Sequence, residues 1–267
     1  MQTEPEDCAV LAPGTLAGRS AFVTGAGSGI GRGIALRLAA LGMTVFGTGR
    51  RAAMLEETAK AAEGLSGRFL FEPCNVRDSE AVTALVTSAG EAHGIDLLVN
   101  NAGGQFFAPA AEIRRKGWDS VIDLNLSAVF TVTQAAHPFL RRRGGAVVSI
   151  SLSGVERGSM GLAHSVAARA GVLGLTRSLA LEWAADGIAL NCIGPGTVVT
   201  EGLAGEAARP MLDRLVAATP MGRATSIAEV AELVAYLASP AGRLMTGQLI
   251  QIDGGAHIGP GLHMMAG

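Results

Sequence analysis

Charged and aromatic residues are scarce in this chain of 267 residues, and no strong charge bias is present. Charged residues make up 16% and aromatic residues 4%, against 49% hydrophobic residues. So large an apolar share predicts a substantial core and argues against disorder except at the ends. The net charge of −2 argues against nucleic-acid binding. The short basic runs "RRKGW" (residues 114–118) and "RRRGG" (residues 141–145) are interpreted as solvated helix ends.

Metal-site, secretory and membrane signals are also missing. Cys8, Cys74 and Cys192 are odd in number and lack metal-type spacing, a pattern typical of a reducing compartment. The five histidines are dispersed, which predicts no bound metal. The acidic start "MQTEPEDCAV" does not resemble a secretory signal, and no apolar run reaches membrane-spanning length. We therefore expect a soluble, cytoplasmic protein that binds neither nucleic acid nor membrane.

Short apolar runs alternate with longer helical patterns along almost the whole chain. Such runs, separated by helices, predict buried parallel strands. They cover residues 20–24, 44–49, 68–73, 96–100, 146–151, 189–194 and 248–253. The predicted fold class is α/β, a single doubly wound Rossmann-type domain with a seven-stranded parallel sheet. We expect this domain to span residues 18–255, between a loose N-terminal arm (residues 1–17) and a loop-like tail (residues 256–267).

The stretch "TGAGSGIG" (residues 24–31) directly follows the first predicted strand and opens a helix. Glycines let the backbone turn sharply and approach a pyrophosphate, and the positive end of the helix points at that charge. In this position the pattern predicts dinucleotide binding rather than an ordinary turn. The cofactor-binding residues expected here are Gly25, Ser28, Gly29, Ile30 and Gly31.

The end of the second predicted strand indicates which dinucleotide is preferred. An acidic residue there would bind the adenosine ribose hydroxyls, but the position holds Gly49, followed by Arg50 and Arg51. A guanidinium can bind a 2′-phosphate through two hydrogen bonds, so the sequence favours NADP(H) over NAD(H). The alternative is that both arginines merely open the next helix.

Five motifs in order resemble the short-chain dehydrogenase/reductase family, over residues 17–255. They are "TGAGSGIG", "NNAG" (residues 100–103), "NLSAVF" (residues 125–130), "NCIGPGTVVT" (residues 191–200) and "MTGQLIQIDGG" (residues 245–255). The family usually has an aspartate in its adenine-contacting motif, where "CNVRD" here has Asn75, and an amide can accept the same hydrogen bond. The resemblance implies further cofactor-binding residues: Asn75, Val76, Asn101, Ala102, Gly103, Arg169, Pro195, Gly196, Val198 and Thr200.

The catalytic dyad that the resemblance implies is missing. Family members usually use a tyrosine as the proton donor and a lysine four residues later. Aligning "AARAGV" with the family pattern puts Arg169 at the lysine position and Ser165 at the tyrosine position. The single tyrosine and the two lysines of the chain lie elsewhere: Tyr236, Lys60 and Lys116.

Hydrogen-bond donors around the missing dyad are the candidate catalytic residues. Arg169 can bind the nicotinamide ribose but cannot release a proton near neutral pH, and Ser165 is a poor acid. Histidine is a residue type that can exchange protons near neutral pH, but on a helix His164 points about 100° away from Ser165, which favours a packing or interface role. The candidate set is Asn125, Ser151, Ser153, Ser165 and Arg169. Purely structural roles for Asn125 and the two strand-end serines remain open.

Loss of the tyrosine handicaps carbonyl reduction more than reduction of a conjugated double bond. In an enoyl thioester, hydride goes to the β-carbon, donors can stabilise the enolate oxygen, and water can protonate carbon. The stretches "LLVNNAGGQFFAPAAEIRRKGW", "AHSVAARAGV" and "SLALEWAADGIALNCIGPG" resemble peroxisomal trans-2-enoyl-CoA reductases and, more distantly, 2,4-dienoyl-CoA reductases. That resemblance implies NADPH and a fatty acyl-CoA substrate. "GGQFF" (residues 103–107) could offer backbone donors and an aromatic wall, or simply pack as a loop.

The predicted function is therefore an NADPH-dependent reductase of an enoyl thioester carried on coenzyme A or a carrier protein. Three alternatives stay open: a biosynthetic ketoreductase or dehydrogenase, a non-redox cyclase or isomerase, and an NADP-binding scaffold without catalysis. The family resemblance also implies a homotetramer or homodimer, formed through the helices around Asn125 and Arg169. Residues 201–220 are predicted to cover the substrate.

Overall fold

The computed structural model describes residues 8–200 and 209–259 of the chain. Seven strands form one parallel sheet in the order β3-β2-β1-β4-β5-β6-β7, which confirms the predicted fold class. The strands are β1 (Ser20–Thr24), β2 (Thr44–Gly49), β3 (Arg68–Pro73), β4 (Leu97–Asn100), β5 (Ala146–Ile150), β6 (Ala189–Pro195) and β7 (Gln248–Ile252). The ends of β4 to β7 differ from the expected ones by about one residue, as is usual for strand ends set by hydrogen bonding.

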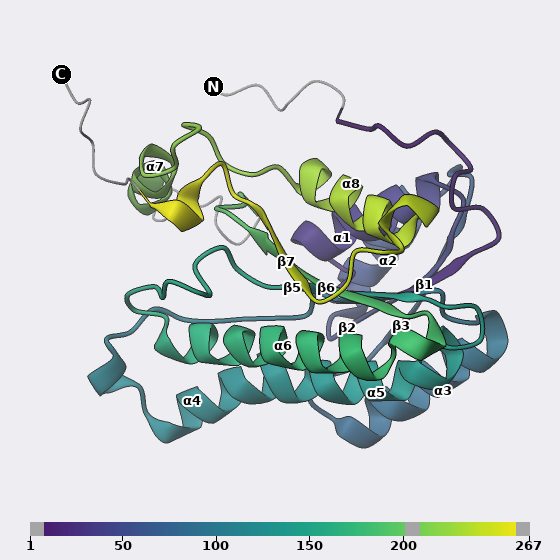
Figure 1. The fold of residues 1–267 in the computed structure, drawn as a ribbon, viewed down its shortest axis with the longest axis horizontal. Coiled ribbons are helices and arrows are strands. Elements are labelled where there is room, and N and C mark those ends of the chain that lie inside the picture. The colour runs from purple at the N-terminus through teal and green to yellow at the C-terminus, as the bar shows by residue number, and fades with distance from the viewer. Residues whose placement is uncertain (1–7, 201–208, 260–267) are drawn as a thin grey trace.

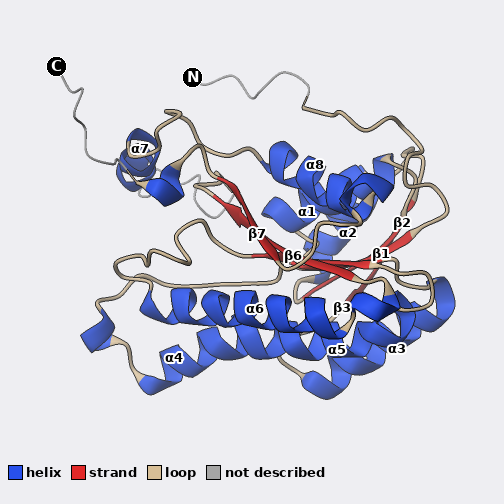
Figure 2. Ribbon diagram, in the orientation of Figure 1, coloured by secondary structure: helices blue, strands red, loops and turns tan. Residues whose placement is uncertain are grey.

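Helices cover both faces of the sheet (Figures 1 and 2). They are α1 (Gly29–Ala40), α2 (Ala52–Ala61), α3 (Ser79–His93), α4 (Arg115–Ile122), α5 (Ala128–Leu140), α6 (Ala163–Glu182), α7 (Arg209–Ala217) and α8 (Ile227–Ala238). Helices α1 and α8 pack together on one face, and α3, α5 and α6 lie on the other. Within the described residues, no helix is long and apolar enough to cross a membrane.

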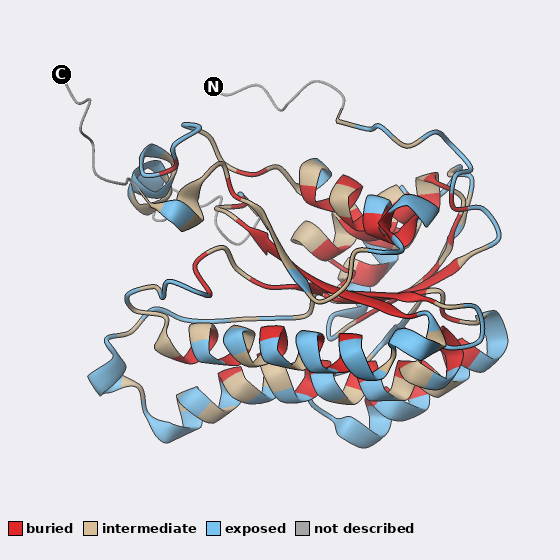
Figure 3. Cartoon of the chain, viewed as in Figure 1, coloured by how far each residue is buried: buried red, intermediate tan, exposed pale blue. Residues whose placement is uncertain are grey.

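Side chains of alternate residues on the central strands pack into two separate hydrophobic cores, one on each face of the sheet (Figure 3). On β1, Val23 belongs to the core beneath α1 and α8, whereas Phe22 belongs to the core beneath α3 and α5. Every residue of β1, β4, β5 and β6 is buried. Helices on both faces explain why these strands are apolar runs in the sequence rather than alternating patterns.

The strand order reverses between β1 and β4. From β1 the chain proceeds outward to β2 and β3, and then returns to place β4 on the other side of β1. In doubly wound sheets such a reversal opens a crevice at the carboxyl ends of the strands, where ligands bind. The fold thus places the loops after β1 and β4 side by side at this crevice.

The described part of the N-terminal arm is packed against the domain rather than loose. Leu16 is fully buried, and its backbone N–H donates to Leu41 O at 3.1 Å. The backbone N–H groups of Val10 and Leu11 both donate to Glu232 Oε1 at 2.9 Å. The expectation of a loose arm missed this because the partners, Leu41 just after α1 and Glu232 on α8, are distant in the sequence. In the tail, Ala256–Ile258 forms a short 3₁₀ turn, and residues 260–267 lie outside the described residues.

Candidate functional site

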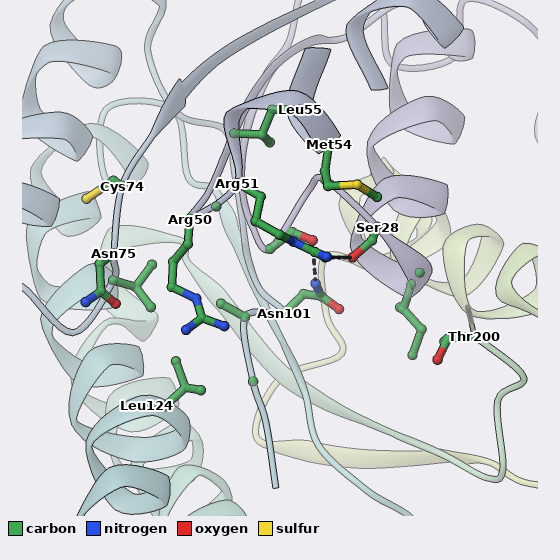
Figure 4. Close-up of a pocket in the computed structure, with 18 residues that line it drawn as sticks. Ser28, Arg50, Arg51, Met54, Leu55, Cys74, Asn75, Asn101, Leu124 and Thr200 are labelled. Carbon is green, nitrogen blue, oxygen red and sulfur yellow. Dashed lines mark hydrogen bonds between the residues drawn. The ribbon is translucent and has the colours of Figure 1, made fainter. Parts of the chain in front are cut away.

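A cavity of about 590 Å³ lies at the carboxyl ends of β1, β2, β3 and β4 (Figure 4). Most of the predicted cofactor-binding residues line it: Gly25, Ser28, Gly29, Ile30, Arg50, Arg51, Asn75, Val76, Asn101, Ala102, Gly103 and Thr200. Residues that sequence analysis did not select complete the wall: Gly27, Gly49, Met54, Leu55, Cys74 and Leu124. Several of them are sequence neighbours of predicted residues, and this was the signal by which the sequence could have indicated that they line the cavity.

Gly31, Arg169, Pro195, Gly196 and Val198 were also predicted to bind the cofactor, but none of them lines this cavity. A Cβ on Gly31 would collide with the carbonyl oxygen of Gly25, so this glycine lets α1 pack closely against the loop after β1. A Cβ on Gly196 would lie 2.9 Å from the Cα of Asp253. Val198 forms a bridge with Thr225. Contacts of these residues with a cofactor stay a prediction.

Hydrogen bonds tie the loop after β1 to the loop after β4. Thr24 Oγ1 accepts from the backbone N–H groups of Asn101 and Ala102, both at 3.0 Å. Asn101 Nδ2 donates back to Thr24 O at 3.0 Å and to Gly25 O at 3.3 Å. No side chain caps the first turn of α1, and no acidic residue lies in that turn. The free N–H groups and positive end of α1 are therefore available to an anion at the cavity wall.

Two arginines follow β2 at the cavity mouth (Figure 4). Arg51 Nη2 donates to Ser28 Oγ at 3.2 Å, which brings the guanidinium to the glycine loop. Arg50 projects into the cavity and makes no hydrogen bond or ion pair with any described residue. An exposed guanidinium without a partner can bind phosphate through two hydrogen bonds.

Helix α6 places Ser165 and Arg169 one turn apart near the same crevice. Ser165 is fully buried, and its Oγ donates to Gln105 Oε1 at 2.6 Å. Arg169 Nη1 donates to Ile150 O, while Nε is buried without a partner in the described chain. Burial lowers the pKa of the Arg169 guanidinium to about 10. It therefore stays charged at neutral pH, as expected of an arginine in the lysine position.

Asn125 lies in a π-helical segment, Asp123–Ser127, between α4 and α5. Its Nδ2 donates to Gly104 O at 2.8 Å, and its Oδ1 accepts from Gly104 N–H at 3.0 Å. A Cβ on Gly103 would lie 2.9 Å from both Asn125 Oδ1 and Arg169 Nη2. The asparagine therefore clamps the loop after β4 beside the cavity. Among the described residues, neither the oxygen nor the nitrogen of this amide bonds to a backbone group of its own helix.

Ser151 and Ser153 lie just beyond the end of β5. The backbone N–H of Ser151 donates to Ile193 O at 2.7 Å, and its buried hydroxyl has no partner among the described residues. Ser153 is half-buried, and its backbone N–H donates to Pro195 O at 3.2 Å. Their roles in catalysis stay a prediction.

Gln105 is the site residue that sequence analysis missed. Only the backbone and the aromatic rings of its loop were considered there, yet the side chain joins the residue at the tyrosine position. Ser165 donates to Gln105 Oε1, and Nε2 makes no hydrogen bond with any described residue. The amide N–H groups of Gln105 are thus free to donate to a ligand. The only signal in the sequence was a polar residue directly after a glycine pair.

Comparison with known proteins identifies the family. The model of a family described as enoyl-(acyl carrier protein) reductase matches residues 25–257, nearly the whole sheet and its helices. The chain belongs to the short-chain dehydrogenase/reductase family. It is thus an oxidoreductase by family, as the five motifs indicated.

Similar members of the short-chain dehydrogenase/reductase family include reductases of different thioesters. A probable 2,4-dienoyl-CoA reductase of Bacillus subtilis is 34% identical over 248 residues, covering 91% of this chain and 98% of that protein. A 3-oxoacyl-[acyl-carrier-protein] reductase, FabG, of Thermotoga maritima is 37% identical over 245 residues, covering 90% and 98%. A solved structure of a proposed NAD(P)-dependent gluconate 5-dehydrogenase from Beutenbergia cavernae, with NADP bound at low occupancy, is 34% identical. Its TM-score is 0.86, with 92% of this chain and 100% of that one covered.

Proposed function

We propose that this protein is an NADPH-dependent reductase of an activated carbon–carbon double bond, with an enoyl thioester of coenzyme A or a carrier protein as substrate. The observation that carries the proposal is the hydrogen bond from the hydroxyl of Ser165, the residue predicted at the tyrosine position, to Gln105. Neither a serine hydroxyl nor an amide is an acid near neutral pH. The site therefore suits a reaction whose last proton goes to carbon.

NADPH fits the residues of the cavity. The start of α1 has no side-chain cap, so its backbone N–H groups are available to a pyrophosphate. Gly31 has no side chain, which lets α1 lie close to the loop after β1. Arg50 and Arg51 suit a 2′-phosphate, and no carboxylate at the end of β2 would repel it. Bound there, NADPH would supply the hydride. The NADP-bound relative supports the same cofactor here.

The residues around Gly103 can stabilise the charge that develops on the thioester oxygen. Gln105 Nε2 is free to donate a hydrogen bond to that oxygen, and Ser165 holds the amide by its other end. Arg169 keeps a positive charge close to Gly103. Donors aimed at a developing oxyanion can be worth about 3–4 kcal/mol of barrier each. Water then protonates the α-carbon.

A 3-oxoacyl thioester is the competing substrate, because similar proteins include 3-oxoacyl-[acyl-carrier-protein] reductases. Reduction of its ketone forms an alkoxide that needs a proton on oxygen at once. The described residues around Ser165 offer amide, hydroxyl and guanidinium donors, and none of them releases a proton readily at neutral pH. This difference favours the enoyl substrate.

Purified protein incubated with NADPH and crotonyl-CoA, acetoacetyl-CoA or buffer alone tests the proposal. We expect consumption of NADPH with crotonyl-CoA, measured by nicotinamide absorbance and by mass spectrometry of the butyryl product. Consumption with acetoacetyl-CoA alone would reverse the assignment. Calorimetric binding of NADPH without turnover of either thioester would favour a cofactor-binding scaffold.

A further inference from the structure

His164 is a fully buried imidazole beside Ser165 that the proposed reaction does not use. Neither ring nitrogen has a hydrogen-bond partner among residues 8–200 and 209–259. By contrast, His137 and His257 lie 3.0 Å from the carboxylates of Asp186 and Asp253. The His164 ring therefore has no polar partner in this part of the chain, and its contacts are those of packing.

The main contact of the His164 ring is with Phe106. The two ring centroids are 4.3 Å apart, and the planes meet at 75°, an edge-to-face arrangement. On α4, a Cβ at Gly117 would lie 2.9 Å from Phe106 Cζ, so the phenyl ring packs directly against the helix where this glycine has no side chain. Phe106 is thus held between α4 and the start of α6, although 40% of its surface is exposed.

Three contacts in succession join the loop after β4 to the start of α6. The backbone N–H of Ala108 donates to Gly161 O at 3.0 Å, Phe106 meets His164, and Gln105 accepts from Ser165. At the other end, Asn125 fixes Gly104 through two hydrogen bonds. Gln105 therefore lies between a glycine held by Asn125 and a phenylalanine whose ring contacts His164.

We infer that His164 is a positioning residue: through the Phe106 ring, it fixes the loop that presents Gln105 Nε2 to the substrate. The inference rests on the proposed function, in which Gln105 donates to the thioester oxygen. A donor misplaced by about 1 Å can cost on the order of a hundredfold in rate. Loss of the imidazole should therefore lower kcat and leave cofactor binding intact, because the part of this loop that lines the cavity is held separately, by hydrogen bonds from Asn101 and Ala102 to Thr24.

Kinetics of paired variants test this inference. We expect His164→Ala to lower kcat with crotonyl-CoA by about ten- to a hundredfold, with the NADPH Kd unchanged by calorimetry. His164→Phe, which retains an aromatic ring, should recover most of the loss, and His164→Asn should not. In a Gln105→Ala background, His164→Ala should add no further loss, because it acts through Gln105. His93→Ala, an exposed histidine on α3, is the control and should behave as wild type.

Recovery by asparagine but not by phenylalanine would overturn the inference, as would an undiminished effect of His164→Ala in the Gln105→Ala background. If His164→Ala does not fold, Phe106→Leu removes the same contact from its exposed side and replaces it in the cycle.

Crystal structures decide the inference even if the wild type reduces no enoyl thioester, an outcome that would remove only the proposed function. We expect the Ser165–Gln105 hydrogen bond to be lost in His164→Ala or Phe106→Leu and retained in His93→Ala. An unchanged Gln105 side chain in both test variants would overturn the role assigned to His164.

Discussion

At the residue scale, Ser165 stands at the position predicted for the tyrosine, and its hydroxyl donates to Gln105 Oε1. Arg169 stands at the position predicted for the lysine. It keeps its charge when buried, since the lowered guanidinium pKa of about 10 is still well above neutrality. In the proposed reaction these two residues orient and polarise the substrate and do not transfer protons.

Gln105→Ala should remove the main neutral donor to the thioester oxygen. We expect kcat with crotonyl-CoA to fall by about 10²–10³, with the NADPH Kd unchanged, in steady-state kinetics and calorimetry. Gln248→Ala, on an exposed position of β7, is the matched control. Full activity of Gln105→Ala would show that this amide does not stabilise the transition state.

Arg50→Ala and Arg51→Ala should weaken NADPH selectively. A charge-assisted hydrogen bond contributes about 1.5–3 kcal/mol, so we expect an increase in NADPH Kd of about ten- to a hundredfold for either change. The NADH Kd should stay the same, because NADH lacks the 2′-phosphate. Calorimetry with both nucleotides measures this, with exposed Arg142→Ala as control. Equal weakening of NADH would contradict a contact with the 2′-phosphate.

At the element scale, α8 begins with a capping box that also holds an ion pair. Ser226 Oγ accepts from Glu229 N–H at 3.1 Å, and Glu229 Oε2 accepts from Ser226 N–H at 2.8 Å. Arg223 Nη2 lies 2.6 Å from Glu229 Oε1. The hydrogen bond from Arg223 is the main cause that lowers the pKa of the Glu229 carboxyl to about 2. The charge on Glu229 thus stabilises the start of a helix that packs on α1.

Glu229→Gln should therefore reduce stability in a pH-dependent way. Because the folded-state pKa is lowered from 4.5, the carboxylate stabilises the protein above pH 4.5, and this contribution is lost as pH falls toward 2. We expect a loss of about 1 kcal/mol in the free energy of unfolding at pH 7 and a shrinking difference at acid pH. Urea titrations of both proteins between pH 7 and pH 3 measure it. A difference that grows toward acid pH would contradict this sign.

At the scale of the whole molecule, a segment before β1 packs on the folded domain. The N-terminal residues from Val10 to Leu16 cover α1 and α8, which are far from them in sequence but adjacent in space. Arg37 connects the two sides, donating to Glu232 Oε2 at 2.6 Å and to Leu11 O at 3.0 Å. This segment therefore belongs to the folded unit, in contrast to the expected boundary near residue 18.

Leu16→Ala should destabilise the fold although the residue precedes β1. A fully buried leucine replaced by alanine costs about 2–5 kcal/mol, and we expect a loss in this range in urea unfolding. Leu215→Ala, at a leucine on α7 that is 42% exposed, is the matched control and should change stability by less than about 0.5 kcal/mol. An equal effect of both changes would show that the arm contributes nothing.

Self-association is expected through the outer surfaces of α5 and α6. Phe130 is 45% exposed and Leu181 is 83% exposed on these helices. Light scattering should give two or four times the 27.1 kDa of the chain, and Phe130→Asp should lower that mass because a carboxylate would be buried without a partner. Thr83→Asp, on the exposed side of α3, is the control. A monomeric wild type would contradict this expectation.

The sequence by itself determined the sheet and most of the residues that line the cavity, and it predicted that the dyad is missing. Strands read as apolar runs because helices cover both faces, and the glycine loop is recognisable because its spacing is local. The absence of a tyrosine and a lysine from α6 can be recognised from the sequence alone, by its composition and an alignment. Only the tertiary structure decided which side chain Ser165, the residue predicted at the tyrosine position, contacts. Gln105 and Ser165 are 60 residues apart, and Gly104 and Asn125 are 21 apart. The hydrophobic periodicity of the sequence does not predict which loop side chain contacts which helix side chain, because that contact depends on how β4 and α6 pack in space.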